Sequence, residues 1–384
     1  MNNMYIEAKR FSSTLSIVIP CFNESKTLRR CVENVLQVDW GEVSVEIIIV
    51  DDGSKDNSLE IATRLTSEYP NIHVISHSRN SGKGSALRSG FQSVSGDFVA
   101  VQDADMEYSP NDLKRLLVPL IAGDADVVFG SRFLTTHAHR VLHFWHSLGN
   151  RFLTLLSNMF TDMNLTDMET CYKVFRREVI QSIQIEENRF GFEPEVVAKI
   201  SDLRLRVYEM GISYYGRTYE EGKKIGVRDG FRALFCIVKY NAHRAPLPIQ
   251  FCFYLLIGGL AAIVNLLFFL LLYECGVSAL AAALTAFAIA AIANYILCIK
   301  TVFRQKAKWP LVVELLFYIA VVAVAACIDS GVTLALLGLV PAWVAKLSGT
   351  AVSLIANFAG RRFVVFREPS RGPWTSTFDS KETL

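Results

Sequence analysis

The C-terminal third of the chain is almost entirely apolar, and this feature restricts the fold more than any other. Four apolar runs lie at about residues 251–273, 277–299, 315–338 and 342–359. Each run is long enough to cross the hydrocarbon core of a bilayer as a helix. A water-soluble core is excluded, because no amphipathic segments cover so much apolar sequence. We therefore predict a transmembrane domain of four helices over residues 246–368, followed by a flexible tail over residues 369–384.

The apolar part contains an internal repeat. AAIVNLLFFLLL and AACIDSGVTLAL place Asn265 opposite Asp329, and IANYILCIKTVF and IANFAGRRFVVF place Asn294 opposite Asn357. The repeat is one helical hairpin long, so both copies should cross the membrane in the same orientation. Asp329 would cost roughly 2.5–3.5 kcal/mol in mid-membrane, so it should face protein, a lipid headgroup or water, in a packing or a functional role.

Positive charge predicts the direction of the spans. The basic residues beside the runs are Lys239, Arg244, Lys300, Arg304, Lys306, Lys308, Arg361, Arg362 and Arg367. All of them fall on the side that carries the termini, whereas the short links ECGVS and GLVP have none. Lys346 is an exception to this pattern, because it lies near the start of the last run, on the opposite side. Because basic loops stay cytoplasmic, we expect an integral membrane protein with both termini and residues 1–245 in the cytoplasm.

Residues 1–245 have the pattern of a soluble α/β domain. Five short apolar runs are typical of buried strands, at residues 15–20, 45–50, 72–75, 98–102 and 126–130. Segments of helical composition follow the first four. Continuous apolar strands joined by helices predict a mostly parallel, Rossmann-like sheet that is covered on both faces. The formal net charge of +2 and the lack of a basic tract in this part give no sign of nucleic-acid binding.

Polar side chains stand just beyond the carboxyl ends of four of these runs. They are Asn23–Glu24, Asp51–Asp52, Asp103–Asp105 and Ser131–Arg132. Ligands of open α/β sheets bind beyond the carboxyl ends of the strands. Four polar groups that converge on one edge therefore predict a binding site there.

Three carboxylates at alternate positions, Asp103, Asp105 and Glu107, follow the fourth run. In extended chain, alternate side chains point the same way, so Asp103 and Asp105 can share one face. A hard divalent cation, Mg²⁺ or Mn²⁺, would offset their repulsion and keep positions open for phosphate oxygens. A solvated turn is the alternative for an isolated pair, but the convergence of strand ends favours the cation.

Two further motifs at this edge each have two interpretations. In VDDGS, Asp51 or Asp52 could accept hydrogen bonds from ribose hydroxyls, or could form a turn with Gly53. In NSGKGSALRSG, glycines lead into a helix that contains Lys83. The N-terminus of such a helix favours anions, but a plain loop fits the glycines equally well.

Five motifs together resemble the family 2 glycosyltransferases. IVIPCFNE, VDDGS, NSGKGSALRSG, QDADMEYSP and VVFGSRF occur in that order, over about residues 13–245. They are most similar to the synthases of polyprenyl-phosphate sugars, such as dolichol-phosphate mannose or glucose synthases. The resemblance implies a glycosyltransferase-A fold, a nucleotide-sugar donor such as UDP-glucose or GDP-mannose, a polyprenyl phosphate acceptor and an inverting transfer.

Carried over position by position, the resemblance implies roles for single residues. The donor would be held by Pro20, Phe22, Glu24, Asp51, Asp52, Lys83 and Asp103. The metal would be held by Asp103, Asp105 and Glu107, and relatives often carry glutamine at the last of these positions. The catalytic residues would be Asp105, Asp167 and Arg132.

The acceptor side needs fixed positive charge, because an anionic lipid phosphate must approach an anionic donor. The candidates are Arg132 in GSRF, Arg217, Lys223 and Lys224 in YYGRTYEEGKKIG, and His146 and Arg151 in FWHSLGNRF. The loop YYGRTYEEGKKIG matches basic positions of the family. His146 and Arg151 are only the nearest substitutes for an arginine that relatives usually carry. Taken singly, each could be an ordinary surface charge.

Two amphipathic stretches, near residues 148–161 and 228–244, are expected at the membrane surface. The residues that share a face are Phe152, Leu155, Leu156, Met159 and Phe160 in the first, and Phe231, Leu234, Phe235 and Val238 in the second. Such helices bind bilayer interfaces. A core-facing helix has the same period, but the neighbouring membrane domain favours the interface.

Residues of about 248–368 resemble the GtrA-like four-helix membrane proteins, which implies a tether or help for lipid-linked sugars in crossing the bilayer. We expect a membrane-bound hexosyltransferase, compatible with a homo-oligomer. A processive polysaccharide synthase is one alternative, but its QxxRW-type motif is absent from the sequence. A protein that only binds or translocates lipid-linked sugars is the other, and the acidic triplet argues against it.

Overall fold

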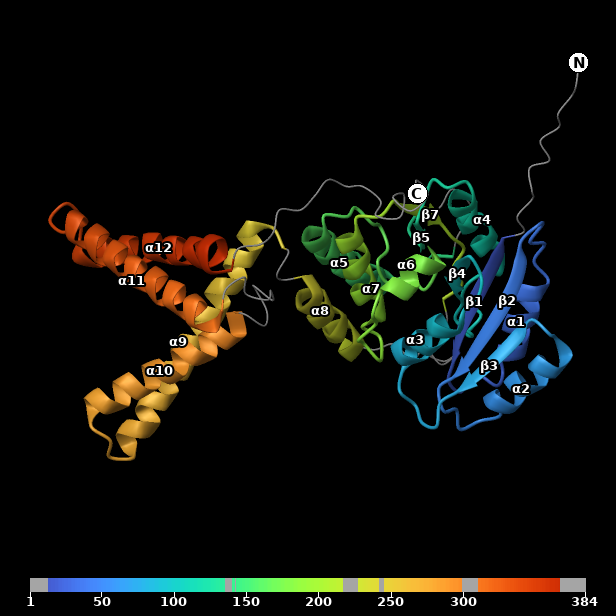
Figure 1. The fold of residues 1–384 in the computed structure, drawn as a ribbon, viewed down its shortest axis with the longest axis horizontal. Coiled ribbons are helices and arrows are strands. Elements are labelled where there is room, and N and C mark those ends of the chain that lie inside the picture. Colours follow the sequence, from blue (N-terminus) through green and yellow to red (C-terminus); the bar gives the residue numbers. More distant parts are fainter. Residues whose placement is uncertain are drawn as a thin grey trace, which may run out of the picture. The chain divides into compact units, whose positions relative to one another are not determined.

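The computed structural model describes residues 13–134, 140–141, 143–216, 227–241, 245–298 and 310–366 (Figure 1). These residues form two compact units, which divide between Tyr240 and Asn241. The first unit contains a sheet with helices around it, and the second contains long helices.

The first unit is built on a seven-stranded sheet with the order β3-β2-β1-β4-β6-β5-β7. Its strands are β1 (Thr14–Cys21), β2 (Ser44–Asp51), β3 (Ile72–Ser76), β4 (Phe98–Val101), β5 (Val127–Ser131), β6 (Lys173–Arg176) and β7 (Val207–Gly211). Neighbouring strands are parallel except where β6 pairs with β4 and β5. The mostly parallel sheet and the five predicted strands are therefore confirmed.

The central strands are buried on both faces. β1 and β2 pair with Ile17 opposite Ile47 and Ile19 opposite Ile49, and all four side chains are fully buried. The helices that follow the first four strands are α1 (Leu28–Leu36), α2 (Ser58–Glu68), α3 (Lys83–Ser93) and α4 (Pro110–Ile121). A strand covered on both sides needs an unbroken apolar run, and this is why the pattern of the sequence locates these strands.

The sequence pattern does not predict β6 and β7. β6 has four residues and begins with Lys173, which is fully buried. The Nζ atom of Lys173 donates hydrogen bonds to the carbonyl oxygens of Met168 and Thr170. In β7, Tyr208 is exposed and the next residue, Glu209, has an acidic side chain. Polar side chains thus interrupt the apolar pattern in both strands.

Four further helices belong to this part of the chain: α5 (Phe144–Thr161), α6 (Arg177–Ser182), α7 (Phe192–Leu203) and α8 (Val227–Asn241). α5 begins before the predicted residue 148 and turns an apolar side outward. Trp145, Phe152 and Leu155 are exposed, whereas Thr154 and Ser157 are buried. Phe160, which the prediction placed on the same apolar face, is buried. The position of α5 at the membrane interface stays a prediction.

α8 also exposes aromatic side chains. Phe231 and Phe235 are exposed, while Cys236 and Ile237 are buried. Residues 242–244, which the prediction included in this helix, lie outside the described residues.

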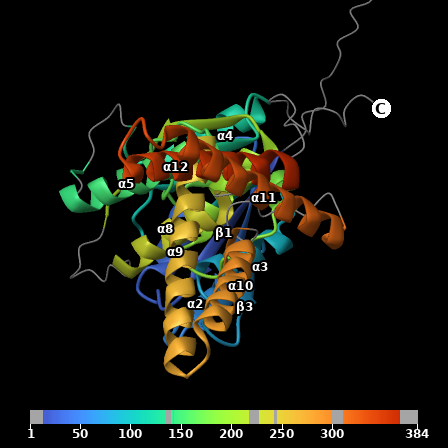
Figure 2. The same ribbon diagram turned by 90° about the vertical axis from the view of Figure 1, so that its left-hand side faces the viewer.

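The second unit consists of α9 (Leu247–Glu274), α10 (Ala279–Leu297), α11 (Leu311–Leu336) and α12 (Ala342–Gly360), which continues into the π-helical segment η3 (Arg361–Val365). α9 packs along α10, and α11 along α12, as two hairpins (Figure 1, Figure 2). Most large apolar side chains point outward; Leu256, for example, is 68% exposed. An apolar exterior of this kind is stable only in a lipid environment.

Helices form at all four predicted positions. Three of them contain stretches that are long and apolar enough to cross a membrane, at Leu247–Glu274, Leu280–Leu297 and Val312–Leu336. Within the described part of the chain, α12 does not meet the same criterion. The chain is thus a membrane protein, and the fourth span and the orientation stay predictions.

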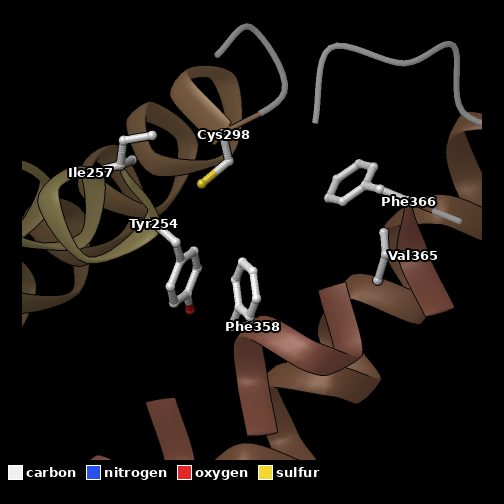
Figure 3. Close-up of a cluster of buried hydrophobic side chains, with 6 residues drawn as sticks. All are labelled: Tyr254, Ile257, Cys298, Phe358, Val365 and Phe366. Atoms are coloured by element: carbon white, nitrogen blue, oxygen red, sulfur yellow. The ribbon is translucent and has the colours of Figure 1, made fainter. Parts of the chain in front are cut away.

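The two hairpins meet at a cluster that combines apolar and polar side chains. Figure 3 shows the buried apolar members: Tyr254, Ile257, Cys298, Phe358, Val365 and Phe366. Arg361 lies in the same junction. Its Nη1 donates to Asn294 Oδ1 over 2.8 Å and its Nε donates to Asn357 Oδ1 over 3.2 Å. Its guanidinium carbon lies 5.4 Å from the ring centre of Tyr254 and 4.4 Å from that of Tyr318.

This junction, which we call the arginine cage (Arg361, Asn294, Asn357, Tyr254 and Tyr318), follows the internal repeat. The alignment places opposite each other Tyr254 and Tyr318, Asn294 and Asn357, and Cys298 and Arg361. One copy of the repeat thus supplies a cation where the other has a thiol, and the matching amides of both copies bind that cation.

Asp329 lies in α11 and accepts a hydrogen bond of 3.1 Å from the Thr350 hydroxyl of α12. It therefore faces protein, one of the three environments that the sequence predicts for it.

Candidate active site

The carboxyl ends of the central strands open into one cavity of about 670 Å³ in the first unit. Its walls include many predicted site residues: Pro20, Phe22, Glu24, Asp52, Lys83, Asp103, Asp105, Glu107, Arg132 and His146. The structure thus brings together the donor, metal and part of the acceptor candidates, which come from six separate stretches of sequence.

Asp52 closes the loop that leads into α3. Its carboxylate accepts hydrogen bonds from the backbone N–H groups of Ser81 (3.0 Å) and Gly82 (2.6 Å), and its Oδ1 lies 2.7 Å from His77 Nδ1. Gly82 has a φ of +101°, and a Cβ there would lie 2.3 Å from the carbonyl oxygen of Asn188. The glycines of this motif therefore allow close approach of a second loop, a reason that neither sequence interpretation includes.

Lys83 is the first residue of α3 and joins two acidic residues of the cavity wall. Its Nζ lies 3.0 Å from Asp103 Oδ1 and 3.1 Å from Glu193 Oε1. Burial alone would lower the pKa of Lys83, but the negative charges of Asp103 and Glu193 outweigh burial and raise this pKa well above its usual value. Glu193, in α7, is a site residue that the sequence analysis misses, because no motif links it to the strand ends.

The acidic triplet does not have the expected extended form. β4 ends at Val101, a turn follows at Ala104 and Asp105, and Met106 has a φ of +65°. The turn is fixed from within, because Asp105 Oδ1 accepts the N–H of Glu107 over 3.1 Å. The argument from alternation along a strand was therefore wrong, although Asp105 and Glu107 still line the cavity.

The carboxylates of the acidic triplet differ in how well they fit a divalent cation. Among the described residues, no three His, Cys, Asp or Glu side chains are already arranged to hold a metal ion. Glu107 accepts a hydrogen bond of 2.8 Å from the Tyr214 hydroxyl. Asp103 and Asp105, however, open on the same cavity. Mg²⁺ commonly uses one or two protein carboxylates together with substrate phosphates, so this pair fits a cation that arrives with a diphosphate.

Arg132 and Asp167 form a buried ion pair beside the cavity. The Nε and Nη2 atoms of Arg132 each lie 2.7 Å from one carboxylate oxygen of Asp167, a bidentate arrangement. Burial alone would lower the pKa of Arg132, but Asp167 raises it well above its usual value. Arg132 lines the cavity and Asp167 does not. Asp167 thus positions Arg132, whereas the prediction gave it a place at the reacting groups.

The segment that carries Asp167 is itself fixed by backbone hydrogen bonds. The N–H groups of Thr166 and Asp167 donate to Glu209 of β7, over 2.9 and 3.1 Å. The N–H of Met168 donates to the Thr154 hydroxyl of α5 over 3.1 Å. The arginine side of the cavity is therefore rigidly attached to both a strand and a helix.

α8 forms part of the cavity wall through Asp229, Gly230 and Ala233. It is attached to the domain at Glu187, which is 3% exposed and accepts hydrogen bonds from Arg232 Nη2 (2.5 Å), Lys239 Nζ (2.9 Å) and the Tyr240 hydroxyl (3.0 Å).

Burial would raise the pKa of Glu187, but these three hydrogen bonds outweigh burial and lower it to about 2. One helix thus joins an exposed aromatic face to the wall of the site.

Two further predicted residues that the structure describes, Asp51 and Arg151, are not among the residues that line the cavity. Asp51 is buried, and its Oδ2 accepts the N–H of Ser54 over 3.2 Å, as in the turn interpretation of VDDGS. Arg151 is exposed and lies over the Phe133 ring at 5.3 Å. Donor contact by Asp51 and acceptor contact by Arg151 stay untested predictions. Arg217, Lys223 and Lys224 lie outside the described residues.

Comparison with known proteins supports both halves of this description. Residues 16–184 match the family Glycosyl transferase family 2, and residues 253–366 match the family GtrA/DPMS, transmembrane domain. Crystal structures of glucosyl-3-phosphoglycerate synthase from Mycobacterium tuberculosis, including a complex with Mn²⁺ and UDP, are similar to 60% of this chain and 80% of that chain, with a TM-score of 0.47 and 20% identity.

Curated relatives match about half of this chain. A dolichyl-phosphate beta-glucosyltransferase of Trichomonas vaginalis is 29% identical over 213 residues, which are 52% of this chain and 65% of the relative. An undecaprenyl-phosphate 4-deoxy-4-formamido-L-arabinose transferase of Yersinia enterocolitica is 32% identical, over 47% and 54%. A dolichol-phosphate mannosyltransferase of Pyrococcus furiosus is 26% identical, over 59% and 64%. The matches span about half to two thirds of these relatives.

The order of the motifs, the mostly parallel sheet and the two family matches agree with one another. The chain therefore contains a family 2 glycosyltransferase domain at residues 16–184 and a GtrA/DPMS transmembrane domain at residues 253–366.

Proposed function

We propose that this protein transfers a hexose from a nucleoside diphosphate sugar to a polyprenyl phosphate, with inversion at the anomeric carbon. The observation that carries the proposal is that the strand-end carboxylates and Arg132 line the same cavity. Such a cavity can hold two anions, one through a cation and one through a guanidinium. The relatives are named as dolichyl-phosphate, undecaprenyl-phosphate and dolichol-phosphate sugar transferases, which supports the same chemistry.

The donor lies against the carboxyl ends of β1 and β2 in this proposal. Pro20, Phe22, Glu24 and Asp52 would hold the nucleoside, because all four line the cavity there. UDP-glucose and GDP-mannose are the two donors to test, and UDP-glucose comes first because GKGSALR looks closer to the glucose synthases.

Asp103 and Asp105 would hold Mg²⁺ or Mn²⁺ against the diphosphate, with Glu107 beside them. When bound, the cation supplies Lewis-acid stabilisation of the leaving diphosphate. Lys83 keeps Asp103 in place from the protein side, and a cation that binds there would share this carboxylate with Lys83.

The acceptor phosphate is anionic near neutral pH, so it needs position and charge compensation more than a base. One of its oxygens forms a bond to the anomeric carbon, and the bond from that carbon to the diphosphate breaks, with the electron pair leaving on the nucleoside diphosphate. Arg132 would bind the acceptor phosphate, held in place by Asp167. Arg217, Lys223 and Lys224 are proposed to add charge on the same side.

The membrane half would keep the site at the lipid surface. We propose four spans with the catalytic unit in the cytoplasm, and α5 and α8 as helices that lie in the interface with Trp145, Phe152, Phe231 and Phe235 toward lipid. These four side chains are exposed in the structure, and aromatic residues are favoured at the level of the headgroups.

The proposal is tested with the full chain in lipid nanodiscs. Radiolabelled UDP-glucose or GDP-mannose is mixed with polyprenyl phosphate and Mg²⁺ or Mn²⁺, and the products are separated into lipid, polymer and water-soluble fractions. Label in a lipid monophosphate sugar supports the proposal. Label in a polymer would indicate a processive synthase, and donor binding without any transfer would indicate a protein that only binds sugars.

A further inference from the structure

Glu169 is a cavity residue that no motif of the sequence singles out. It follows Asp167 and Met168 in the connection between α5 and β6. Its Oε1 is buried and has no hydrogen-bond partner. Within the described residues, the buried side-chain oxygens that lack a partner belong to Asp51, Ser157, Glu169, Thr170, Gln250 and Thr333. Of these six residues, Glu169 is the one that lines the cavity.

Buried polar atoms without a partner are rare in folded proteins, and in a cavity wall a ligand can satisfy them. A shift of the backbone cannot easily bring a partner to Oε1 of Glu169, because the segment before it is held by hydrogen bonds. The N–H groups of Thr166, Asp167 and Met168 all donate hydrogen bonds to other elements. Glu169 is therefore presented to the cavity by a rigid support, which is the arrangement that accurate ligand recognition requires.

The surroundings of Glu169 decide its charge. Burial, and next the negative charge of Glu193, raise the pKa of Glu169 to about 8. The side chain is thus a neutral acid at neutral pH, which can donate one hydrogen bond and accept others. The nearby amine of Lys173 donates to the carbonyl oxygens of Met168 and Thr170.

The chemistry of the two substrates indicates what Glu169 binds. Phosphate groups offer mainly negative acceptor oxygens, and a carboxyl group is a poor partner for them, since ionisation would set two negative charges against each other. A sugar hydroxyl both donates and accepts, so it suits either protonation state of Glu169. Of the proposed substrates, the hexose carries several such groups close to the reacting carbon.

We propose that Glu169 binds a hydroxyl group of the transferred hexose and thereby contributes to the choice of sugar. This inference rests on the proposed function and adds a specificity residue to it. Glu169 lies in the same short segment as Asp167, which holds Arg132. The residue proposed to bind the sugar and the residue that positions Arg132 therefore share one fixed piece of backbone.

The test removes the hydrogen bond from each side in turn. Values of kcat/KM are measured for the full chain in nanodiscs, with the parent donor and its 2-, 3-, 4- and 6-deoxy analogues, in the UDP-glucose or the GDP-mannose series. In the wild type, one analogue should be at least about tenfold poorer than the parent. In Glu169→Ala, kcat/KM for the parent donor should fall to about the wild-type value for that analogue. The kcat/KM for the analogue itself should not fall further. Glu169→Gln, which retains a donor and an acceptor, should restore most of the discrimination.

Thr170→Ala is the matched control. It removes a hydroxyl oxygen that is likewise buried and without a hydrogen-bond partner, from the next position, which does not line the cavity. The discrimination among analogues should stay as in the wild type. Glu169→Met fills a similar volume with an apolar end, and it repeats the test if the alanine variant is poorly folded.

Equal losses for every analogue in the wild type and in the Glu169 variants would overturn the inference, while turnover of the parent sugar would still support the proposed transfer. A change in metal dependence without a change in sugar discrimination would overturn it too, and would assign Glu169 to the cation. Absence of any hexose transfer by the wild type would instead refute the proposed function itself.

Discussion

Each unit of the chain contains a buried arginine, and the two arginines are held in different ways. Arg132 is 8% exposed and is bound by the two oxygens of Asp167. Arg361 is 5% exposed and is bound by the neutral amides of Asn294 and Asn357. The first arginine faces a cavity, whereas the second lies where the two hairpins of the membrane unit meet.

The difference shows how charge serves two purposes in one chain. A carboxylate offsets the cost of burying Arg132 and fixes its orientation, which leaves its open side for a third group, proposed here to be the acceptor phosphate. In the cage, amide dipoles and the rings of Tyr254 and Tyr318 stabilise Arg361, and its partners come from all four long helices. We infer that Arg132 serves binding and that Arg361 serves assembly of the repeat.

The largest effect is expected from Asp105→Asn, which alters the cavity without touching either arginine. Transfer should fall by at least about a hundredfold, because loss of a metal ligand removes several kcal/mol of transition-state stabilisation. Metal-dependent donor binding, measured by titration calorimetry, should fall with it. Asp39→Asn serves as the control, since the side chain of Asp39 is 90% exposed and does not line the cavity. Full activity of Asp105→Asn with both Mg²⁺ and Mn²⁺ would remove the metal assignment.

Asp167→Asn should have the next largest effect, because it leaves Arg132 buried without its counter-charge. Breaking a buried pair in this way costs roughly 3–5 kcal/mol of folding free energy. The acceptor KM should rise much more than the donor Kd.

Asp126→Asn is the matched control for that variant. Asp126 is buried and bonds Arg206 through Nε (3.1 Å) and Nη2 (2.8 Å), away from the cavity. It should lower Tm with no change in acceptor KM. If both variants change acceptor KM alike, Arg132 has no special part in acceptor binding.

Arg361→Cys should have a smaller effect, and on stability alone. It gives the second copy of the repeat the residue that the first copy has at Cys298. Loss of two amide hydrogen bonds and two ring contacts should lower the stability of the membrane unit by about 1–3 kcal/mol. Thermal unfolding in nanodiscs measures this, together with donor Kd, which should not change. Arg362→Cys removes the same charge from the next position, and an equal loss there would show that the cage contributes nothing.

The smallest effect is expected at Glu187, which attaches α8. The lowered pKa of Glu187, about 2, means that its hydrogen bonds stabilise the native state fully above the unfolded pKa of 4.5 and are lost as pH falls through the range between these values. The difference in stability between the wild type and Glu187→Gln should therefore be constant near neutral pH and shrink below pH 4.5. Hydrogen exchange of α8 measures it, and a difference that grows toward low pH would contradict the assignment.

The sequence predicts those parts of the fold that local pattern determines. Unbroken apolar runs locate β1 to β5, and the long apolar runs locate α9 to α12. β6 is missed because a buried lysine begins it, and Lys173 is satisfied by carbonyl oxygens that only the folded loop supplies. Local pattern cannot show partners of this kind.

The site was predictable in its strand-end residues and much less in their partners. Motif positions identify Asp103 and Lys83, but Glu193 comes from a distant helix and its role depends on tertiary contact. Asp167 was predicted as a catalytic residue, and the structure shows it behind Arg132. The cage could not be predicted either, because the alignment of the repeat pairs Asn294 with Asn357 without showing that both bind Arg361.

The central claim is that the cavity joins a nucleotide sugar to a lipid phosphate, and release of nucleoside diphosphate by the full chain in nanodiscs tests it most directly. Release is measured with UDP-glucose or GDP-mannose and a divalent cation, in the presence of polyprenyl phosphate, of polyprenol with the same chain, or of neither lipid. The account predicts rapid release with polyprenyl phosphate alone, because the anionic phosphate is the nucleophile that Arg132 positions. Equal release with polyprenol, or with no lipid, would contradict it.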